Sequence, residues 1–205
     1  WEEYLKKFRK GFRKTFENRE RFLRKKGRVE LSRFKKPFNL DEVMGEVFSI
    51  SLKSWKAKKG TAIASNGAVR NLYSDLAKEL MNIDSLDISL LRLNNEPLAY
   101  IFGARYKKSF IDIDIAFNLD FSNVSPGIQL HNFIIKNLLE EDIDEFDFVM
   151  AHDYKKEYTD YEREFINITI FNKGFYPKFL YFMKSRFFPV LNGLRQNLHD
   201  RRKNS

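Results

Sequence analysis

The chain has 205 residues, enough to bury a core in one domain of ordinary size or in two small ones. It contains no cysteine, which excludes disulfides and thiol catalysis and fits a cytoplasmic protein. We expect no secretory signal, because residues 1–30 are highly charged, and no membrane-spanning helix, because no long run of residues is apolar.

The net charge of +9 is concentrated at the two ends of the chain. Residues 1–36 carry 15 Lys and Arg against 5 Asp and Glu, and residues 176–205 carry 7 against 1. Residues 37–175 carry 15 against 22, so a nucleic-acid hypothesis can rest only on the ends. Because the sequence begins with Trp1 and not with Met, we expect it to be a piece of a longer protein.

The first part of the chain is expected to be mainly helical. Between residues 2 and 26, apolar residues such as Leu5, Phe8 and Phe12 recur at spacings of three and four, which predicts an amphipathic helix that ends at Gly27. In chain order, the next predicted elements are an extended piece at 29–34, a helix from Asn39 or Asp41 to Trp55, a loop at 56–67 and a helix at about 68–82.

The pattern then changes to strands. Apolar runs at 86–93, 97–105 and 109–117 are joined by connections short enough for hairpins, which predicts three consecutive antiparallel strands. A helix that starts near Gly127 follows. The remaining predicted elements are a strand at 145–150, a short polar helix at about 153–159, a strand at 164–171 and an aromatic-rich helix from near Pro177 that carries Phe179, Phe182, Phe187 and Leu191.

A turn of sequence Ser125-Pro126-Gly127 connects the third of these strands to the long helix. This order places free backbone N–H groups, at the positive end of a helix dipole, beside a sheet edge, and such a site suits an anion, typically a pyrophosphate. An ordinary helix start, with Ser125 as N-cap and Pro126 at the first helical position, is compatible with the same pattern.

Five motifs follow one another along the chain. They are a basic helix at 4–27, Trp55 after the next helix, Asn95-Glu96-Pro97-Leu98-Ala99, Ser125-Pro126-Gly127-Ile128-Gln129-Leu130 and Asp153-Tyr154-Lys155. In this order of elements and motifs, from about Tyr4 to Phe171, the chain resembles the GNAT acyltransferases. More narrowly, it resembles the GNAT-like family of bacterial cellulose and exopolysaccharide biosynthesis.

The resemblance implies an α/β, GNAT-like acyl-CoA N-acyltransferase fold, in which helices flank a central, mostly antiparallel sheet. The domain would occupy residues 1–175, and residues 176–205 would form a C-terminal helix that packs on it or on a preceding GNAT-like half. The enzyme would move an acyl group from acyl-CoA, without a metal, to an amine or hydroxyl of a sugar or cell-envelope precursor.

The resemblance also assigns the CoA pyrophosphate to the turn before the long helix. Ser122 and Ser125 stand where the family's phosphate-binding pattern has Gln or Arg and Gly, but backbone N–H donors still suffice. The residues expected to bind the cofactor are Val124, Ser125, Gly127, Ile128 and Gln129.

Two carboxylates are candidates for the acceptor side of the reaction. Asp112 and Asp114 alternate with isoleucines, which predicts that both lie on one strand face, roughly 7 Å apart. If that face lines a cleft, one of them could accept the acceptor's proton, and we favour Asp114 as the base and Asp112 as a substrate contact. The alternative is a solvent-facing strand face.

A second group of candidates follows the strand at 145–150. His152 could act as a base, Tyr154 or Tyr158 could protonate a leaving thiolate, and Lys155 could contact the substrate, because ligands sit beyond the carboxyl ends of strands in open α/β sheets. The alternative is an ordinary helix start that is capped by Asp153.

Other candidates lie outside these two groups. Trp55 and Lys56 could contact the acceptor or a phosphate, or they could be a core tryptophan and a solvated basic loop. We interpret His131 and His199 as surface or helix residues, and three scattered histidines without cysteine predict no metal site.

Two other functions are compatible with the sequence. One is a Fem-like aminoacyl or peptidyl transferase, which shares the fold of the family and uses aminoacyl-tRNA as donor. The other is a non-catalytic module that binds nucleic acid or an anionic surface through the basic residues 1–26.

Overall fold

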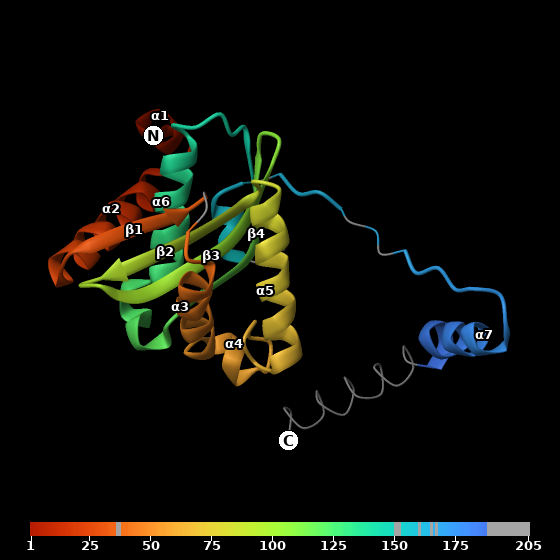
Figure 1. Ribbon diagram of the computed structural model, residues 1–205. Coiled ribbons are helices and arrows are strands. Elements are labelled where there is room, and N and C mark those ends of the chain that lie inside the picture. The colour runs from red at the N-terminus through yellow and green to blue at the C-terminus, as the bar shows by residue number, and fades with distance from the viewer. Residues whose placement is uncertain (36–37, 150–152, 160, 165, 167, 188–205) are drawn as a thin grey trace, which may run out of the picture. The chain divides into compact units, whose positions relative to one another are not determined.

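The computed structural model describes residues 1–35, 38–149, 153–159, 161–164, 166 and 168–187 (Figure 1). The contacts divide the chain into two compact units, Trp1–Asp160 and Tyr161–Ser205, and this division falls before the boundary expected at residue 175. The His152 and His199 candidates lie outside the described residues.

The first unit is built on a five-stranded sheet in the order β1-β2-β3-β4-β5. The first four strands pair antiparallel, which confirms the predicted meander, and the short β5 pairs parallel to β4. Asn94 and Asn95 turn the chain between β2 and β3 with positive φ, as a tight hairpin requires. The strands are β1 Val29–Phe34, β2 Leu86–Leu93, β3 Glu96–Tyr106, β4 Ser109–Phe117 and β5 Glu145–Asp147.

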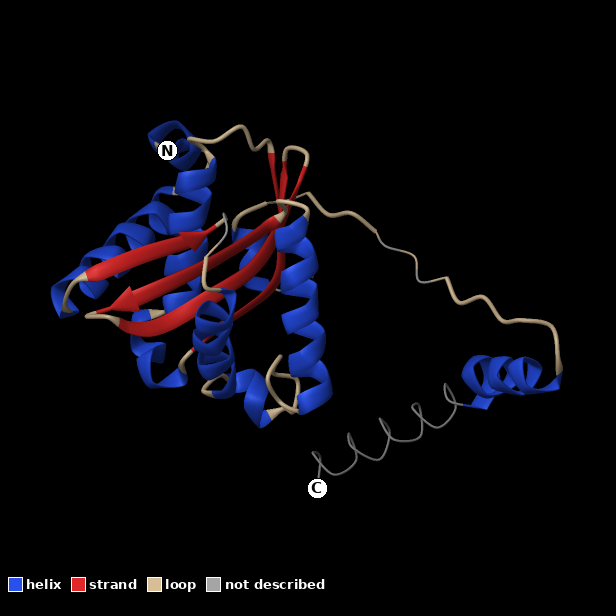
Figure 2. Cartoon of the chain, in the orientation of Figure 1, coloured by secondary structure: helices blue, strands red, loops and turns tan. Residues whose placement is uncertain are grey.

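Helices cover both faces of this sheet, as Figures 1 and 2 show. Two hydrophobic cores lie between the layers, one against α3 and α5 and the other against α2 and α6. The helices of this unit are α1 Glu2–Lys6, α2 Lys10–Lys26, α3 Leu40–Leu52, α4 Trp55–Lys58, α5 Gly67–Asn82 and α6 Pro126–Leu138, with 3-10 turns η1 Leu119–Val124 and η2 Asp153–Glu157.

The N-terminal basic segment is two helices, where the sequence predicted one. The chain is extended at Arg9 (φ −59°, ψ 145°), which separates α1 from α2. The aromatic stripe nevertheless continues across the break, because the rings of Tyr4, Phe8 and Phe12 follow one another at centroid distances of 5.0 Å. Ring packing therefore holds together a segment whose backbone hydrogen bonds are interrupted.

A β-bulge in β4 changes which way its side chains point. Asp114 pairs with Phe102, but Asp112 pairs with Gly103, so Ile113 is one residue too many for its partner strand. Before the bulge, Phe110 joins the core under α6, and after it, Ala116 joins the core under α3 and α5. The prediction that Asp112 and Asp114 share a face is therefore wrong, because one extra residue reverses the alternation.

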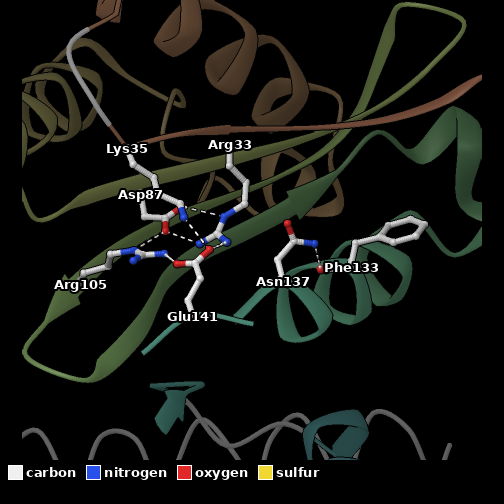
Figure 3. Close-up of polar contacts among 7 residues, drawn as sticks. All are labelled: Arg33, Lys35, Asp87, Arg105, Phe133, Asn137 and Glu141. Atoms are coloured by element: carbon white, nitrogen blue, oxygen red, sulfur yellow. Dashed lines mark hydrogen bonds and ion pairs between the residues drawn. The ribbon is translucent and has the colours of Figure 1, made fainter. Parts of the chain in front are cut away.

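Charged residues tie the sheet to the end of α6 (Figure 3). Asp87 of β2 is fully buried and forms ion pairs with Arg33 of β1 and Arg105 of β3, the latter at 2.7 Å from Nε. Glu141, just beyond α6, binds Arg33 at 2.7 Å, Lys35 at 2.6 Å and also Arg105. Each buried charge in this cluster has an opposite partner, which burial demands.

The second unit contains α7 Phe175–Phe182, which confirms the predicted aromatic helix, followed by the π-helical turn Met183–Phe187. The strand predicted at 164–171 does not form among its described residues. A period-two pattern becomes a strand only beside a partner that satisfies its backbone groups, and no described residue of this unit supplies one. Leu191, expected in the helix, lies outside the described residues.

Across the described ranges, none of the helices combines the length and the apolar character needed to cross a membrane.

Candidate active site

A cavity of about 670 Å³ opens where β4 and β5 separate. The two strands pair only as far as Ile111 and Asp147, and from Asp112 to Phe117 β4 lines the cavity. The other walls are α4, the first turn of α6 and the segment after β5. A volume of several hundred cubic ångströms is typical of a small-molecule site.

The start of α6 faces this cavity with its backbone donors. Ser125 is the N-cap residue and Pro126 follows it in the first turn, as predicted. Ser125 adopts the left-handed conformation (φ 51°, ψ 55°), however, and its side chain makes no capping hydrogen bond. Helix geometry leaves the N–H groups of Gly127 and Ile128 without an intrahelical acceptor, and both residues line the cavity. An anion can bind there.

Gly127 lets this first turn lie close to β4. A Cβ at this position would lie 3.3 Å from Cδ1 of Phe117, tighter than ordinary contact. The other predicted cofactor residues differ in placement: Val124 is buried in the core under α6, and Gln129 is buried with neither amide atom hydrogen-bonded within the described chain. Of the five predicted cofactor residues, Gly127 and Ile128 are the two that line the cavity.

Asp114 lies on the wall near α4, in contact with two polar side chains. Lys56 Nζ forms an ion pair with Oδ1, and the Tyr100 hydroxyl donates to Oδ2 at 2.6 Å. Burial raises the pKa of Asp114, although Lys56 and Tyr100 both act to lower it. The site thus holds a carboxylate that accepts a proton more readily than an exposed one.

Trp55, beside Lys56, lies at the rim of the cavity and is 38% exposed, so it is not a core tryptophan. The ammonium of Lys59 lies 5.0 Å above its ring. Trp55, Lys56 and Asp114 therefore meet on one side of the cavity, as a substrate surface would require.

Asp112 lies on the opposite face of β4, toward α6. Its Oδ2 is 2.9 Å from His131 Nε2, and both side chains are fully buried. His131 lies on a helix, as expected, but it is not a surface residue, because its side chain is fully buried. It lies one turn after Gly127 on the same face of α6. The i, i+4 spacing between Gly127 and His131 could therefore have indicated from sequence that His131 lies on the same side of the helix as the glycine turn.

Lys155 reaches the same corner from η2. Its Nζ donates to the Phe148 carbonyl at 2.6 Å and lies 3.9 Å from Asp112 Oδ2. Burial lowers the pKa of Lys155, and the nearby Asp112 opposes that shift. Tyr154 also lines the cavity, with its ring stacked on His131 at 5.9 Å.

Tyr158, a predicted acid, lies apart from this cavity. Its hydroxyl donates to Asn132 Oδ1 at 2.7 Å, and burial strongly raises its pKa. It lines a smaller hollow of about 200 Å³ together with Tyr4. The hydrogen bond of Tyr158 packs the segment after η2 against α6, which is a structural role. Within the described ranges, no group of three or more His, Asp or Glu side chains is arranged to hold a metal ion.

A mixed sheet flanked by helices, with a cavity beside the start of a helix, is compatible with the GNAT-like fold that the sequence resembles. Residues 10–158 match the family model described as acetyltransferase (GNAT) domain, and the chain belongs to this family. A comparison with curated proteins gave no match.

Solved structures with similar folds share little sequence with this chain. An aminoglycoside acetyltransferase, HMB0005, from an uncultured soil metagenomic sample is 13% identical with a TM-score of 0.51, over 70% of this chain and 99% of that one. AAC(6')-Iy, bound to the bisubstrate analog CoA-S-monomethyl-acetylneamine, is 8% identical with a TM-score of 0.47, over 72% and 99%. The C-terminal domain of a putative lysylphosphatidylglycerol synthetase from Agrobacterium fabrum is 20% identical with a TM-score of 0.48, over 67% and 40%.

Proposed function

We propose that this domain transfers an acetyl group, or another acyl group, from acyl-CoA to an amine or hydroxyl of a sugar or cell-envelope precursor. The observation that carries the proposal is the start of α6, where the N–H groups of Gly127 and Ile128 face the cavity without a capping side chain. These donors suit the pyrophosphate of CoA. The resemblance to the exopolysaccharide-associated family supports the sugar acceptor.

The acceptor would bind on the side of the cavity where Asp114 lies. Asp114, with its raised pKa, would accept the proton of an acceptor that approaches past Trp55 and Lys56. An acceptor amine suits this side, because its nitrogen can donate a hydrogen bond to the carboxylate that later accepts the proton. Most of the rate enhancement would come from holding the thioester and the acceptor together.

Isothermal titration of acetyl-CoA and of CoA into the protein tests the donor site. We expect both to bind, and we expect Gly127→Glu to weaken binding at least tenfold, because the new side chain meets Phe117 and adds a negative charge where the pyrophosphate binds. Gly11→Glu is the matched control, since Gly11 of α2 is exposed and does not line the cavity, and a Cβ there would meet no neighbouring heavy atom within 4 Å.

Failure of the wild-type protein to bind CoA would contradict the donor assignment. If CoA binds, release of its thiol should be measured with amino sugars and with the matching sugars in which a hydroxyl replaces the amine. Transfer to the amino sugar alone would assign N-acylation, and transfer to neither would contradict the sugar acceptor.

A further inference from the structure

The cavity has a second charged corner that the acceptor chemistry does not use. Asp112, His131 and Lys155 come from β4, α6 and η2, and they lie on the face of β4 opposite Asp114. All three side chains are at least nine-tenths buried, yet Asp112 and Lys155 contribute to the cavity wall. A buried lysine is costly unless its charge is used or paired.

Two atoms of this corner have no hydrogen-bond partner among the described residues. They are Oδ1 of Asp112 and Nδ1 of His131, both buried. Leaving a buried polar atom unpaired is unfavourable by roughly 1–3 kcal/mol. The unpaired carboxylate oxygen beside a cavity therefore indicates that a ligand or a bound water completes the corner.

The geometry of the donor site places this corner near the sulfur of CoA. Gly127 lies beside Phe117, since a Cβ at residue 127 would be 3.3 Å from its Cδ1, and Asp112 is five residue steps back along β4 from Phe117, a span of roughly 17 Å. The pantetheine arm has about thirteen bonds from phosphorus to sulfur, roughly the backbone bonds of four to five extended residues. An arm that follows β4 from the α6 turn thus ends beside Asp112 and Lys155.

We propose that Lys155 is a catalytic residue that stabilises and protonates the thiolate of CoA as it leaves, and that the Asp112–His131 pair positions the Lys155 ammonium. The inference rests on the proposed function, since it requires an acyl-CoA donor. Because the bulge at Ile113 places the two carboxylates on opposite faces of β4, Asp114 would act on the acceptor and Asp112 on the leaving group.

With an amine acceptor, the amine nitrogen attacks the thioester carbonyl carbon, a C–N bond forms and the C–S bond breaks with its electron pair on sulfur. Lys155 gives one proton to that sulfur, and Asp114 accepts one proton from the nitrogen. Solvent returns the proton from Asp114 to Lys155, so the products are the amide and the free thiol of CoA.

The burial of Lys155 suits this role. Burial lowers the pKa of Lys155, which brings its ammonium closer to a thiol in acidity and makes the proton transfer easier. The charged and titratable groups that act on Lys155 or lie beside it are Asp112 and Asp114 of β4, Lys56 of α4, His131 of α6, Asp147 of β5 and Tyr154 of η2.

The test measures the acidity of the thiol of bound CoA through the ultraviolet absorbance of its thiolate, so it needs no acceptor. We expect the protein to lower the thiol pKa, and Lys155→Met to raise it by about 1–3 units relative to wild type. Lys155→Arg should also keep the low thiol pKa, but in the separate transfer assay with the amino sugar it should lose about 100-fold in kcat, because arginine holds its charge without releasing a proton. Lys156→Met, at the exposed next residue, is the matched control.

The positioning role of His131 is tested in the same assay. His131→Gln retains a nitrogen that can donate to Asp112 and should keep the thiol pKa within a few tenths of a unit, whereas His131→Leu should raise it as Lys155→Met does. Ile134→Val, one turn along α6, controls for loss of packing alone.

The outcomes separate this inference from the donor assignment. If CoA binds but Lys155→Met leaves the thiol pKa unchanged, the leaving-group role is overturned and the acyltransferase proposal survives. If CoA does not bind, the donor assignment itself fails. If His131→Gln and His131→Leu both match wild type, the positioning role is overturned. If the leucine variant does not fold, the glutamine variant and Lys155→Met still decide the two roles.

Discussion

Asp114 illustrates how the neighbours of one side chain determine its chemistry. Burial alone would hold this carboxyl in its neutral form, while the ammonium of Lys56 and the hydroxyl of Tyr100 favour the ionised form. The result is a carboxylate whose pKa is raised, but less than burial alone would raise it. The pKa of Asp114 is therefore expected to rise when either Lys56 or Tyr100 is removed.

Lys56→Met removes the cation that lowers the pKa of Asp114, so that pKa should rise further, by about one unit or more. If Asp114 is the base, the rate of acyl transfer falls as Asp114 becomes protonated, and the acid limb of the pH–rate profile should move to higher pH. The measurement is kcat/KM against pH for both proteins. Lys59→Met, whose ammonium lies over Trp55, should leave the limb in place.

An acid limb that does not move in Lys56→Met would show that another group, and not Asp114, takes the proton.

At the scale of elements, β4 and its partner β3 are shaped around the bulge at Ile113. Gly103 of β3 lies opposite Asp112, and a Cβ there would be 2.6 Å from Cζ of Phe110 and 3.1 Å from the Asp87 carbonyl. The ring of Phe110 therefore occupies the space that a side chain at residue 103 would need. The strand that separates the two carboxylates depends on this glycine.

Gly103→Ala should lower the free energy of unfolding by about 1–3 kcal/mol, because the methyl group overlaps a fully buried ring and backbone. Gly11→Ala should instead raise it by about 0.5–1 kcal/mol, since nothing crowds residue 11 and alanine favours the helix α2. Urea unfolding of the two variants gives both values. Equal stability of the Gly103→Ala variant and wild type would contradict the close packing at the bulge.

At the scale of the first unit, the ion-pair cluster joins elements that are distant in sequence. Asp87 of β2 and Glu141 after α6 together bind cationic side chains of β1, of the residue Lys35 beyond it and of β3. Burial opposes ionisation of Glu141, but hydrogen bonds from Lys35 and Arg105 and the charge of Arg33 lower its pKa to about 2. The cluster thus makes the stability of the unit depend on pH.

A lowered folded-state pKa stabilises the protein above the unfolded value, and that contribution is lost as the pH falls from 4.5 toward 2. Glu141→Gln should therefore lower the free energy of unfolding near neutral pH by roughly 1–2 kcal/mol, seen as a lower Tm. The difference in Tm between this variant and wild type should shrink over that acid range. Asp142→Asn, at an exposed neighbour that pairs with Lys108, should change Tm little. A deficit that is constant with pH would contradict the role of Glu141.

Much of the fold followed from local pattern. The meander, α3, α5 and α6 were predicted within a few residues, because each carries a regular apolar period and ends at a turn or cap. The break in the basic helix at Arg9 was not predicted. The strand predicted at 145–150 forms, but it ends at Asp147 as a parallel partner of β4, and both features depend on packing partners elsewhere in the chain. The Gly127 turn was found from sequence because its glycine and proline are local signals.

By itself the sequence determined most of the order of elements in the first unit, the glycine turn at the start of α6 and the family, because these depend on residues that are neighbours along the chain. Only the tertiary structure decided which side chains meet at the cavity. The bulge at Ile113 turned Asp112 toward His131 and Lys155 and left Asp114 with Lys56 and Tyr100. A period-two pattern cannot reveal such a bulge, because the bulge is a mismatch between two strands and is defined only once they pair.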